Sequence, residues 1–204
     1  MFNEFWEYQR NITLLSSPKY SVYVNDEIYV SCDSLIQKYD KNLNFILQSN
    51  AIGNYYYGIY FYQSNGMLYA ANTNIYRIHI FNKNLSLMGS ISTSFKPFSI
   101  AQCNDMIAVS EESVTGKINF FKNNILTTNI SISCSRSITS MIVDNYDHMI
   151  ILCYSPSYLY IHHTNGTFTG TAFPICSNSN PMFINFDSKD RLVVVCRSSI
   201  EIYY

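Results

Sequence analysis

The sequence predicts an all-β fold, a β-propeller of about five four-stranded blades, and three observations support this prediction. A polar turn followed by an apolar strand recurs at intervals of 39 to 43 residues. Four short strand patterns fit within one interval, and no stretch has the apolar spacing of an amphipathic helix. Repeats of this length, built from strands, are typical of propeller blades. The equivalent turn positions in the five repeats are Glu27, Met67, Met106, Met149 and Arg191.

The second repeat shows the four strands most clearly. Its first two strands are expected at Gly58–Tyr62 and Met67–Ala71. The turn between them contains Asn65-Gly66, a pair that tolerates the positive φ angles of a tight hairpin. The third and fourth strands are expected at Ile75–Phe81 and Leu85–Ile91.

The two ends of the chain complement each other. The last repeat stops after three strand patterns, and residues 11–16 resemble a fourth strand. We expect this segment to pair with the last blade, because ring closure removes exposed sheet edges. The expected blades of the single domain, residues 1–204, are 18–49, 57–92, 97–131, 138–172 and 181–204, with the closing strand at 11–16.

The composition narrows the function classes. Hydrophobic residues make up 48% of the chain, charged residues only 13%, and the net charge is −1. Without a basic stripe, electrostatic binding to nucleic acid has no support. No apolar run reaches the roughly 18 residues of a membrane-spanning helix. The N-terminal residues do not follow the pattern of a signal peptide, which leaves the localisation open between the cytoplasm and a fragment of an extracellular protein.

The six cysteines are expected to be free thiols. None belongs to a Cys-x-x-Cys pair, which argues against zinc-ribbon and thioredoxin-like sites. Equivalent positions on different blades are too far apart for the Cα separation of about 5.5–6 Å that a disulfide needs. Buried thiols act as small apolar side chains. The cysteines are Cys32, Cys103, Cys134, Cys153, Cys176 and Cys196.

The first repeat resembles an NHL-type propeller repeat. In Ile28–Asp40 an apolar strand ends near Asp33 and a second strand ends in an aromatic-Asp turn, and Asn74–Ile78 fits the second half of this pattern. The resemblance implies a propeller that serves as a binding scaffold. It also implies a broader similarity to gluconolactonase and strictosidine-synthase-like propellers, some of which are enzymes. The positions that match Asp33 in the later repeats are Thr73, Glu112, Ser155 and Arg197.

Candidate site residues lie in the loops between the second and third strands of a blade and between consecutive blades, where propellers usually bind ligands. Asp33, Glu111 and Glu112 are weak candidates for metal ligands, with Ca²⁺ as the cofactor they would suit. The side chains expected to face a ligand are Tyr55, Tyr56, Tyr57 and Arg197, because tyrosine combines apolar area with a hydroxyl group. Of four Asn-x-Ser/Thr sequences, Asn84 and Asn165 are expected in exposed turns that could be glycosylated.

Two functions remain open from the sequence. The first is a non-enzymatic binding or scaffold propeller that recognises a protein, peptide or glycan on its loops. The alternative is a divergent metal-dependent lactonase or esterase. No catalytic or cofactor-binding residue is assigned, since neither a Gly-x-Ser-x-Gly elbow nor a Cys-His constellation occurs.

Overall fold

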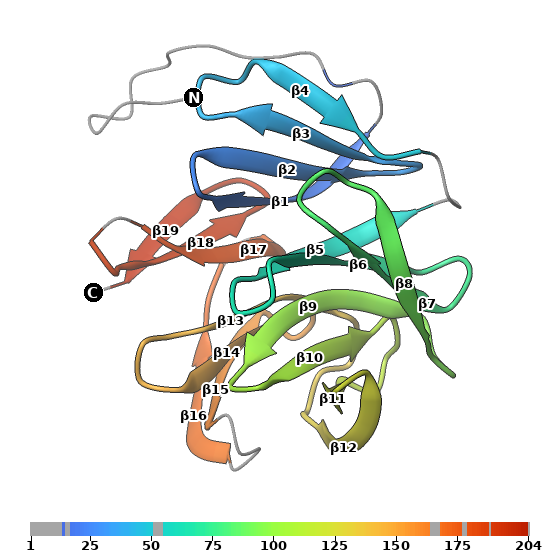
Figure 1. Ribbon diagram of the computed structural model, residues 1–204. Coiled ribbons are helices and arrows are strands. Elements are labelled where there is room, and N and C mark those ends of the chain that lie inside the picture. Colours follow the sequence, from blue (N-terminus) through green and yellow to red (C-terminus); the bar gives the residue numbers. More distant parts are fainter. Residues whose placement is uncertain are drawn as a thin grey trace.

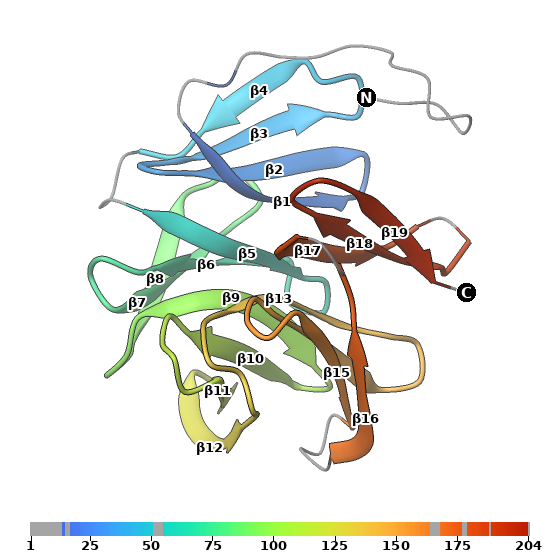
Figure 2. The ribbon, with the colours of Figure 1, turned by 180° about the vertical axis from the view of Figure 1, so that it is seen from behind.

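The computed structural model describes residue 14 and residues 17–50, 55–163, 168–176, 179–187 and 189–203. Every regular element among them is a strand, and the strands form five antiparallel sheets arranged around a centre (Figures 1 and 2). This confirms the prediction of an all-β, five-bladed propeller. The described part of the chain contains no helix that could cross a membrane.

The strands of each sheet follow one another in the chain, from the innermost strand outward. The first sheet holds β1 (Pro18–Val24), β2 (Glu27–Cys32), β3 (Ile36–Asp40) and β4 (Phe45–Gln48). The second holds β5 (Tyr56–Tyr62), β6 (Met67–Asn72), β7 (Arg77–Phe81) and β8 (Leu87–Ser92). The third holds β9 (Pro97–Cys103), β10 (Met106–Glu111), β11 (Lys117–Lys122) and β12 (Ile125–Ser131). The fourth holds β13 (Ile138–Val143), β14 (His148–Cys153), β15 (Tyr158–His163) and β16 (Phe168–Pro174). The fifth has three strands within the described residues, β17 (Pro181–Phe186), β18 (Leu192–Cys196) and β19 (Ile200–Tyr203).

One five-residue turn recurs in four hairpins of the described residues, and the side chain of its first residue stabilises it. The side-chain oxygen of an Asp or Asn accepts backbone N–H groups from the residues two and four places later, at 2.8–3.0 Å. The fourth residue of each turn has a positive φ between 55° and 62°. Asp and Asn favour such turns because their short side chains can bond to nearby backbone groups. The turns are Asp40–Asn44, Asn82–Ser86, Asp144–His148 and Asp187–Arg191.

Apolar side chains fill the spaces between neighbouring sheets. Four clusters of buried residues each combine side chains from two consecutive sheets. Between the first and second sheets, for example, Tyr29 packs with Tyr56, Leu68 and Phe81, all fully buried. Each of the middle three sheets is therefore covered on both faces, which explains why their second strands are largely apolar runs.

The contact between the fifth and first sheets involves fewer described residues. The rings of Tyr20 and Phe183 meet edge to face, with centroids 5.7 Å apart. The predicted closing strand, residues 11–16, lies outside the described residues except for Leu14. Leu14 packs against a small buried cluster of the first sheet that includes Cys32 and Tyr39.

The five innermost strands surround a central cavity of about 480 Å³, to which β1, β5, β9, β13 and β17 all contribute side chains. The backbones of β5 and β9 approach closely at Gly58. A Cβ atom at this position would lie 2.5 Å from the carbonyl oxygen of Phe98 and 2.8 Å from the Cα of Ser99. The glycine therefore permits the tight packing of neighbouring blades near the axis.

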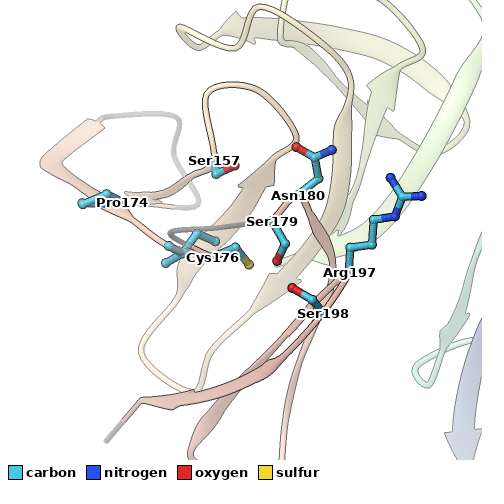
Figure 3. A pocket seen from close by; sticks show the side chains of 8 residues that line it. Ser157, Pro174, Cys176, Ser179, Asn180, Arg197 and Ser198 are labelled. Carbon is cyan, nitrogen blue, oxygen red and sulfur yellow. The ribbon is translucent and has the colours of Figure 1, made fainter.

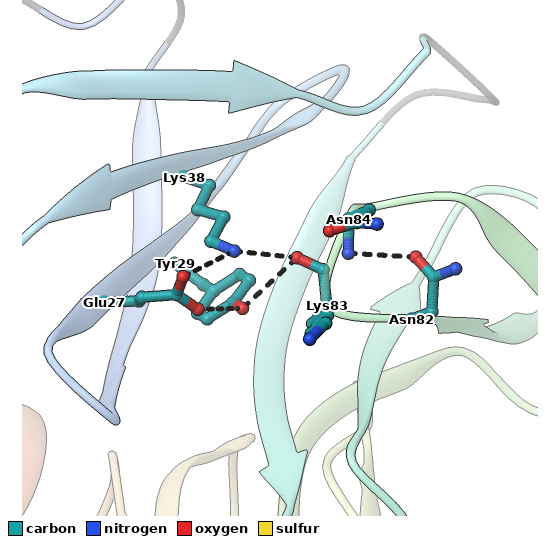
Figure 4. A network of polar contacts seen from close by, with 6 residues as sticks. All are labelled: Glu27, Tyr29, Lys38, Asn82, Lys83 and Asn84. Carbon is teal, nitrogen blue, oxygen red and sulfur yellow. Dashed lines mark hydrogen bonds and ion pairs between the residues drawn. The ribbon is translucent and has the colours of Figure 1, made fainter.

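A polar network ties the first blade to the second (Figure 4). The Lys38 ammonium group, almost fully buried, lies 2.8 Å from the Glu27 carboxylate and donates to the backbone carbonyl of Lys83 in the second blade at 2.9 Å. It also lies 5.3 Å from the ring centroid of Tyr29, whose hydroxyl donates to Glu27 at 2.8 Å. Burial of Glu27 opposes its charge, but the bonds from Lys38 and Tyr29 outweigh burial and lower the pKa of Glu27.

We expect Lys38→Met to destabilise the protein by about 1–3 kcal/mol. The backbone carbonyl of Lys83 loses the hydrogen bond from Lys38, and the Glu27 carboxylate loses its counter-ion. Urea unfolding at neutral pH measures this difference. Lys41→Met is the matched control, since Lys41 pairs with Asp26 at 3.3 Å in a largely exposed position and should give no measurable change. Equal effects of the two substitutions would contradict the inferred role of the network.

The same variant tests the pH dependence. The folded-state pKa of Glu27 lies below the ordinary value of 4.5, so its contribution to stability is present above pH 4.5 and is lost as the pH falls through the folded pKa. The difference in unfolding free energy between wild type and Lys38→Met should therefore shrink in that acidic window. A difference that stays constant down to strongly acidic pH would contradict this coupling.

Candidate functional site

One backbone hydrogen bond repeats in all five blades and defines what we call the loop face. The residue that follows the second strand of each blade donates its N–H to the carbonyl of the residue just before the first strand, at 2.8–3.2 Å. In the fourth blade the donor is Tyr154 rather than Ser155, which corrects the sequence alignment by one residue. The five pairs are Asp33–Ser17, Thr73–Tyr55, Glu112–Lys96, Tyr154–Ser137 and Arg197–Asn180.

The side chains at these five positions have different surroundings. The Thr73 hydroxyl donates to the carbonyl of Pro97 and is buried between blades. The Tyr154 hydroxyl accepts a bond from the Asn180 side-chain amide at 2.7 Å. Asp33 and Glu112 pair with lysines. Arg197 is exposed, and its guanidinium group contacts no ionic or hydrogen-bonding partner among the described residues.

The three carboxylates considered as metal ligands are each neutralised by a nearby lysine. Among the described residues, these carboxylates do not belong to any cluster of three or more Asp, Glu, His or Cys side chains that could hold a metal ion. The group that does gather is Cys176, Cys196 and Glu201, and its two cysteines are joined in a disulfide. The lysine pairs are Lys19–Asp33 at 2.9 Å, Lys117–Glu111 at 3.5 Å and Lys96–Glu112 at 3.7 Å.

Two of the three candidate tyrosines lie on the loop face. Tyr55 is 42% exposed, and the half-buried ring of Tyr57 packs on Phe98 with centroids 4.5 Å apart. The ammonium group of Lys19 lies 5.9 Å from the ring centroid of Tyr55 and 5.6 Å from that of Tyr57. The bond to Asp33 raises the pKa of Lys19 although burial opposes it. These side chains form an aromatic and cationic patch on the first two blades.

Tyr56 differs from the expectation, because it is fully buried and does not face the loops. Side chains alternate along a strand, so Tyr56 at the start of β5 points into the space between blades while Tyr57 points elsewhere. Its hydroxyl lies 2.7 Å from Nδ1 of His79, also buried. Burial first, and then the charge of Arg77, lower the pKa of His79. Tyr56 is a core residue and not a ligand contact.

A cavity of about 770 Å³ opens on the loop face where the fourth and fifth blades meet (Figure 3). Its polar groups come from three loops, which supply Ser157, then Ser179 and Asn180, and finally Arg197 and Ser198. The sequence placed these loops on the ligand side and named Arg197, but it did not indicate that they line one open cavity. The remaining lining residues are Pro174, Ile175 and Cys176.

A second cation, which does not line this cavity, is connected to it through Tyr154. The guanidinium group of Arg136 lies 5.7 Å from the ring centroid of Tyr154. Tyr154 is in turn bonded to Asn180, and the backbone N–H of Arg197 donates to the carbonyl of Asn180 at 2.9 Å. Asn180 therefore contacts Arg197 through its backbone carbonyl and reaches Arg136 indirectly, through the Tyr154 side chain. A cavity with this lining suits an anionic group that accepts several hydrogen bonds.

Two disulfides overturn the expectation of six free thiols. Cys134 pairs with Cys153, and Cys176 with Cys196, at Cα separations of 5.8 and 5.7 Å. The expectation failed because it compared the same repeat position on different blades. The actual partners occupy two different positions of one blade, 19 and 20 residues apart, in a loop and at the end of the second strand. Recurrence of that spacing in two repeats was the available signal. Cys32 and Cys103 take part in neither disulfide, and both are buried.

The second disulfide holds the two loops that carry most of the cavity's polar groups. Cys176 lies three and four residues before Ser179 and Asn180 in the chain, and Cys196 directly precedes Arg197. Glu201 accepts the backbone N–H of Cys176 at 3.1 Å. The first disulfide is its repeat equivalent one blade earlier and does not line the cavity.

No protein-family model matches the sequence, and no curated protein matches it. Solved structures do resemble it. A catalytically inactive virginiamycin B lyase from Staphylococcus aureus, with quinupristin, has a TM-score of 0.73 at 15% identity, over 99% of this chain and 75% of that one. A chain of the Mitotic Checkpoint Complex has a TM-score of 0.72 at 10% identity, over 90% and 62%. The WD40 β-propeller domain of Doa1 has a TM-score of 0.69 at 9% identity, over 92% and 65%. A lyase, a chain of a multiprotein complex and a WD40 domain are thus similar to this chain in fold, and at these identities only the fold is established.

We expect Cys176→Ser with Cys196→Ser to lower the stability by roughly 2–4 kcal/mol and to loosen the cavity loops. Amide hydrogen exchange should become faster at Ser179, Asn180, Arg197 and Ser198. The control is Cys134→Ser with Cys153→Ser, which removes the equivalent disulfide and should cost similar stability without that local change. Equal exchange at the cavity in both double variants would show that the second disulfide does not organise the site.

Proposed function

We propose that this propeller is a non-enzymatic binding module that recognises a protein or peptide ligand on its loop face. The observation that carries the proposal is Arg197, an exposed guanidinium group without a partner among the described residues, at a polar cavity of about 770 Å³. Cavities of roughly 300–1,000 Å³ are typical of ligand sites.

The chemistry of the cavity favours a carboxylate on that ligand. A guanidinium group presents donors in a planar fork that matches the two oxygens of a carboxylate. The Asn180 amide and the hydroxyl groups of Ser179 and Ser198 offer further hydrogen bonds nearby. An acidic side chain or a peptide C-terminus would satisfy this set, and neighbouring loops would contact the rest of the peptide.

The repeat pattern of the sequence and the similarity in fold to other propellers both support a binding module. The NHL-type resemblance of Ile28–Asp40 remains a proposal about the repeat class, and it implies a binding scaffold. Among the similar folds, one chain belongs to the Mitotic Checkpoint Complex and another is a WD40 domain. These likenesses make protein recognition a reasonable use of the fold, while the lining of the cavity indicates the chemistry.

An enzyme is the second candidate, and the similarity in fold to a lyase favours it. The metal-dependent lactonase or esterase version is weaker, because Asp33, Glu111 and Glu112 have lysine partners and do not gather. An enzyme at this face would have to use Arg197 and the nearby hydroxyl groups to stabilise developing negative charge.

The proposal predicts that peptides selected from a displayed library on the immobilised protein will be enriched in acidic residues or in free C-termini. Arg197→Ala should weaken the binding of a selected peptide about tenfold or more, as measured by calorimetry. Arg77→Ala is the control, since Arg77 is also exposed but lies on the second blade, bonded to Ser90, and should leave the affinity unchanged.

Selected peptides that bind equally well to Arg197→Ala would contradict the assigned site. Failure to select any peptide, with binding instead on a glycan array, would replace the peptide ligand by a sugar acid or another glycan. Turnover of lactones or esters that disappears in the Arg197→Ala variant would favour the enzyme.

A further inference from the structure

Two Asn-x-Ser sequences lie on the exposed surface, one in a turn at the end of its blade opposite the loop face and one on an outermost strand. Asn84 lies in the Asn82–Ser86 turn (Figure 4). This turn joins β7 to β8 at the end of these strands that is opposite the loop face. Asn129 lies on β12, the outermost strand of the third sheet. Both asparagines and both following serines, Ser86 and Ser131, are exposed.

The amide groups of these asparagines are available for chemistry. The backbone N–H of Asn84 donates to the side chain of Asn82, but no hydrogen bond of the described residues uses the side-chain amide of Asn84 or of Asn129. A bulky group on either amide would extend into solvent without displacing a buried side chain. Neither position lines the cavity at Arg197.

The two disulfides supply an independent observation about the compartment. Each forms when two thiols lose two protons and two electrons to an oxidant, and such bonds persist in oxidising compartments and are rare in the cytosol. Both occupy the same pair of positions in consecutive blades, so they are a repeated structural feature and not an isolated contact. In eukaryotic cells the compartment that forms disulfides also attaches glycans to Asn-x-Ser/Thr sequences.

We propose that Asn84 and Asn129 are N-glycosylation sites, modified when the chain passes through the secretory pathway. The donor is an oligosaccharide linked to a polyprenyl pyrophosphate. The amide nitrogen of the asparagine forms a bond to the anomeric carbon of the sugar, the bond from that carbon to the pyrophosphate oxygen breaks, and the amide loses one proton. The lipid pyrophosphate is the leaving group, and no oxidation or reduction accompanies the transfer.

The first blade offers a matched control. Its turn Asp40–Asn44 shares with Asn82–Ser86 the hydrogen bonds from the turn backbone and a positive φ at the fourth residue, with Leu43 in place of Leu85. Asn44 also donates its side-chain amide to Asp40 at 2.8 Å. The turn carries Asn42-Leu43-Asn44, which lacks only the serine of Asn84-Leu85-Ser86. Asn44→Ser would therefore complete the acceptor sequence in an equivalent turn.

The experiment expresses the full chain with an added cleavable secretion signal in eukaryotic cells. The secreted protein is alkylated without reduction, and its intact mass is measured before and after treatment with peptide-N-glycosidase. All variants carry Asn11→Gln and Asn165→Gln, because those two acceptor sequences lie outside the described residues. The test variants are Asn84→Gln, Asn129→Gln, Ser86→Ala, Ser131→Ala and Asn44→Ser.

The expected protein carries two glycans, loses one with each single substitution at the two sites, and gains a third with Asn44→Ser. Alkylation should modify only Cys32 and Cys103, and only after unfolding, since both are buried. A secreted, folded protein whose mass does not change with the glycosidase would overturn the proposal. So would six alkylated thiols, failure of the chain to leave the cell in folded form, or glycosylation of the Asn44→Ser turn while Asn84 stays unmodified.

Discussion

The burial of sheets against one another is the constraint on which the rest of this structure depends. A twisted four-stranded sheet with two apolar faces has no stable place in water unless a neighbour covers each face. Here four apolar clusters join consecutive blades, and a ring is the arrangement that covers the most faces. The same packing brings the backbones of neighbouring innermost strands close together near the axis, and Gly58 permits this approach because it has no side chain. The buried Lys38 network adds directional contacts to the mainly apolar interface between the first two blades.

Much of the fold could be predicted because its determinants are local and repeated. Apolar alternation identifies the strands, and Asp or Asn at the start of a turn fixes hairpins such as Asp40–Asn44. What failed depends on contacts across the structure. The orientation of Tyr56 follows from which face of β5 meets the neighbouring blade, and one residue of strand register decides it. The disulfides depend on the path of a loop past the end of a strand, which spacing alone does not define.

The candidate site was predicted in outline only. Loop position indicated Arg197, and the structure adds its lack of an internal partner and its place at a cavity. The sequence named three tyrosines beside Arg197, yet Tyr55 and Tyr57 contact Lys19, and Tyr57 also packs on Phe98. Their patch and the cavity at Arg197 lie on different blades of one face. Among these candidates, Arg197 is the side chain that the described contacts leave unengaged.

The repeated hydrogen bond of the loop face is made by the backbone alone, so it sets the spacing of five positions whatever side chains they carry. Asp33, Thr73, Glu112, Tyr154 and Arg197 occupy these positions with an acid, a hydroxyl, an aromatic ring and a base. At an exposed position such as Arg197, a change of side chain alters the chemistry offered to a ligand without altering the geometry of its support. The scaffold therefore separates folding from specificity, and divergent copies of such a propeller could exchange ligands through substitutions at the rim while the interior stays the same.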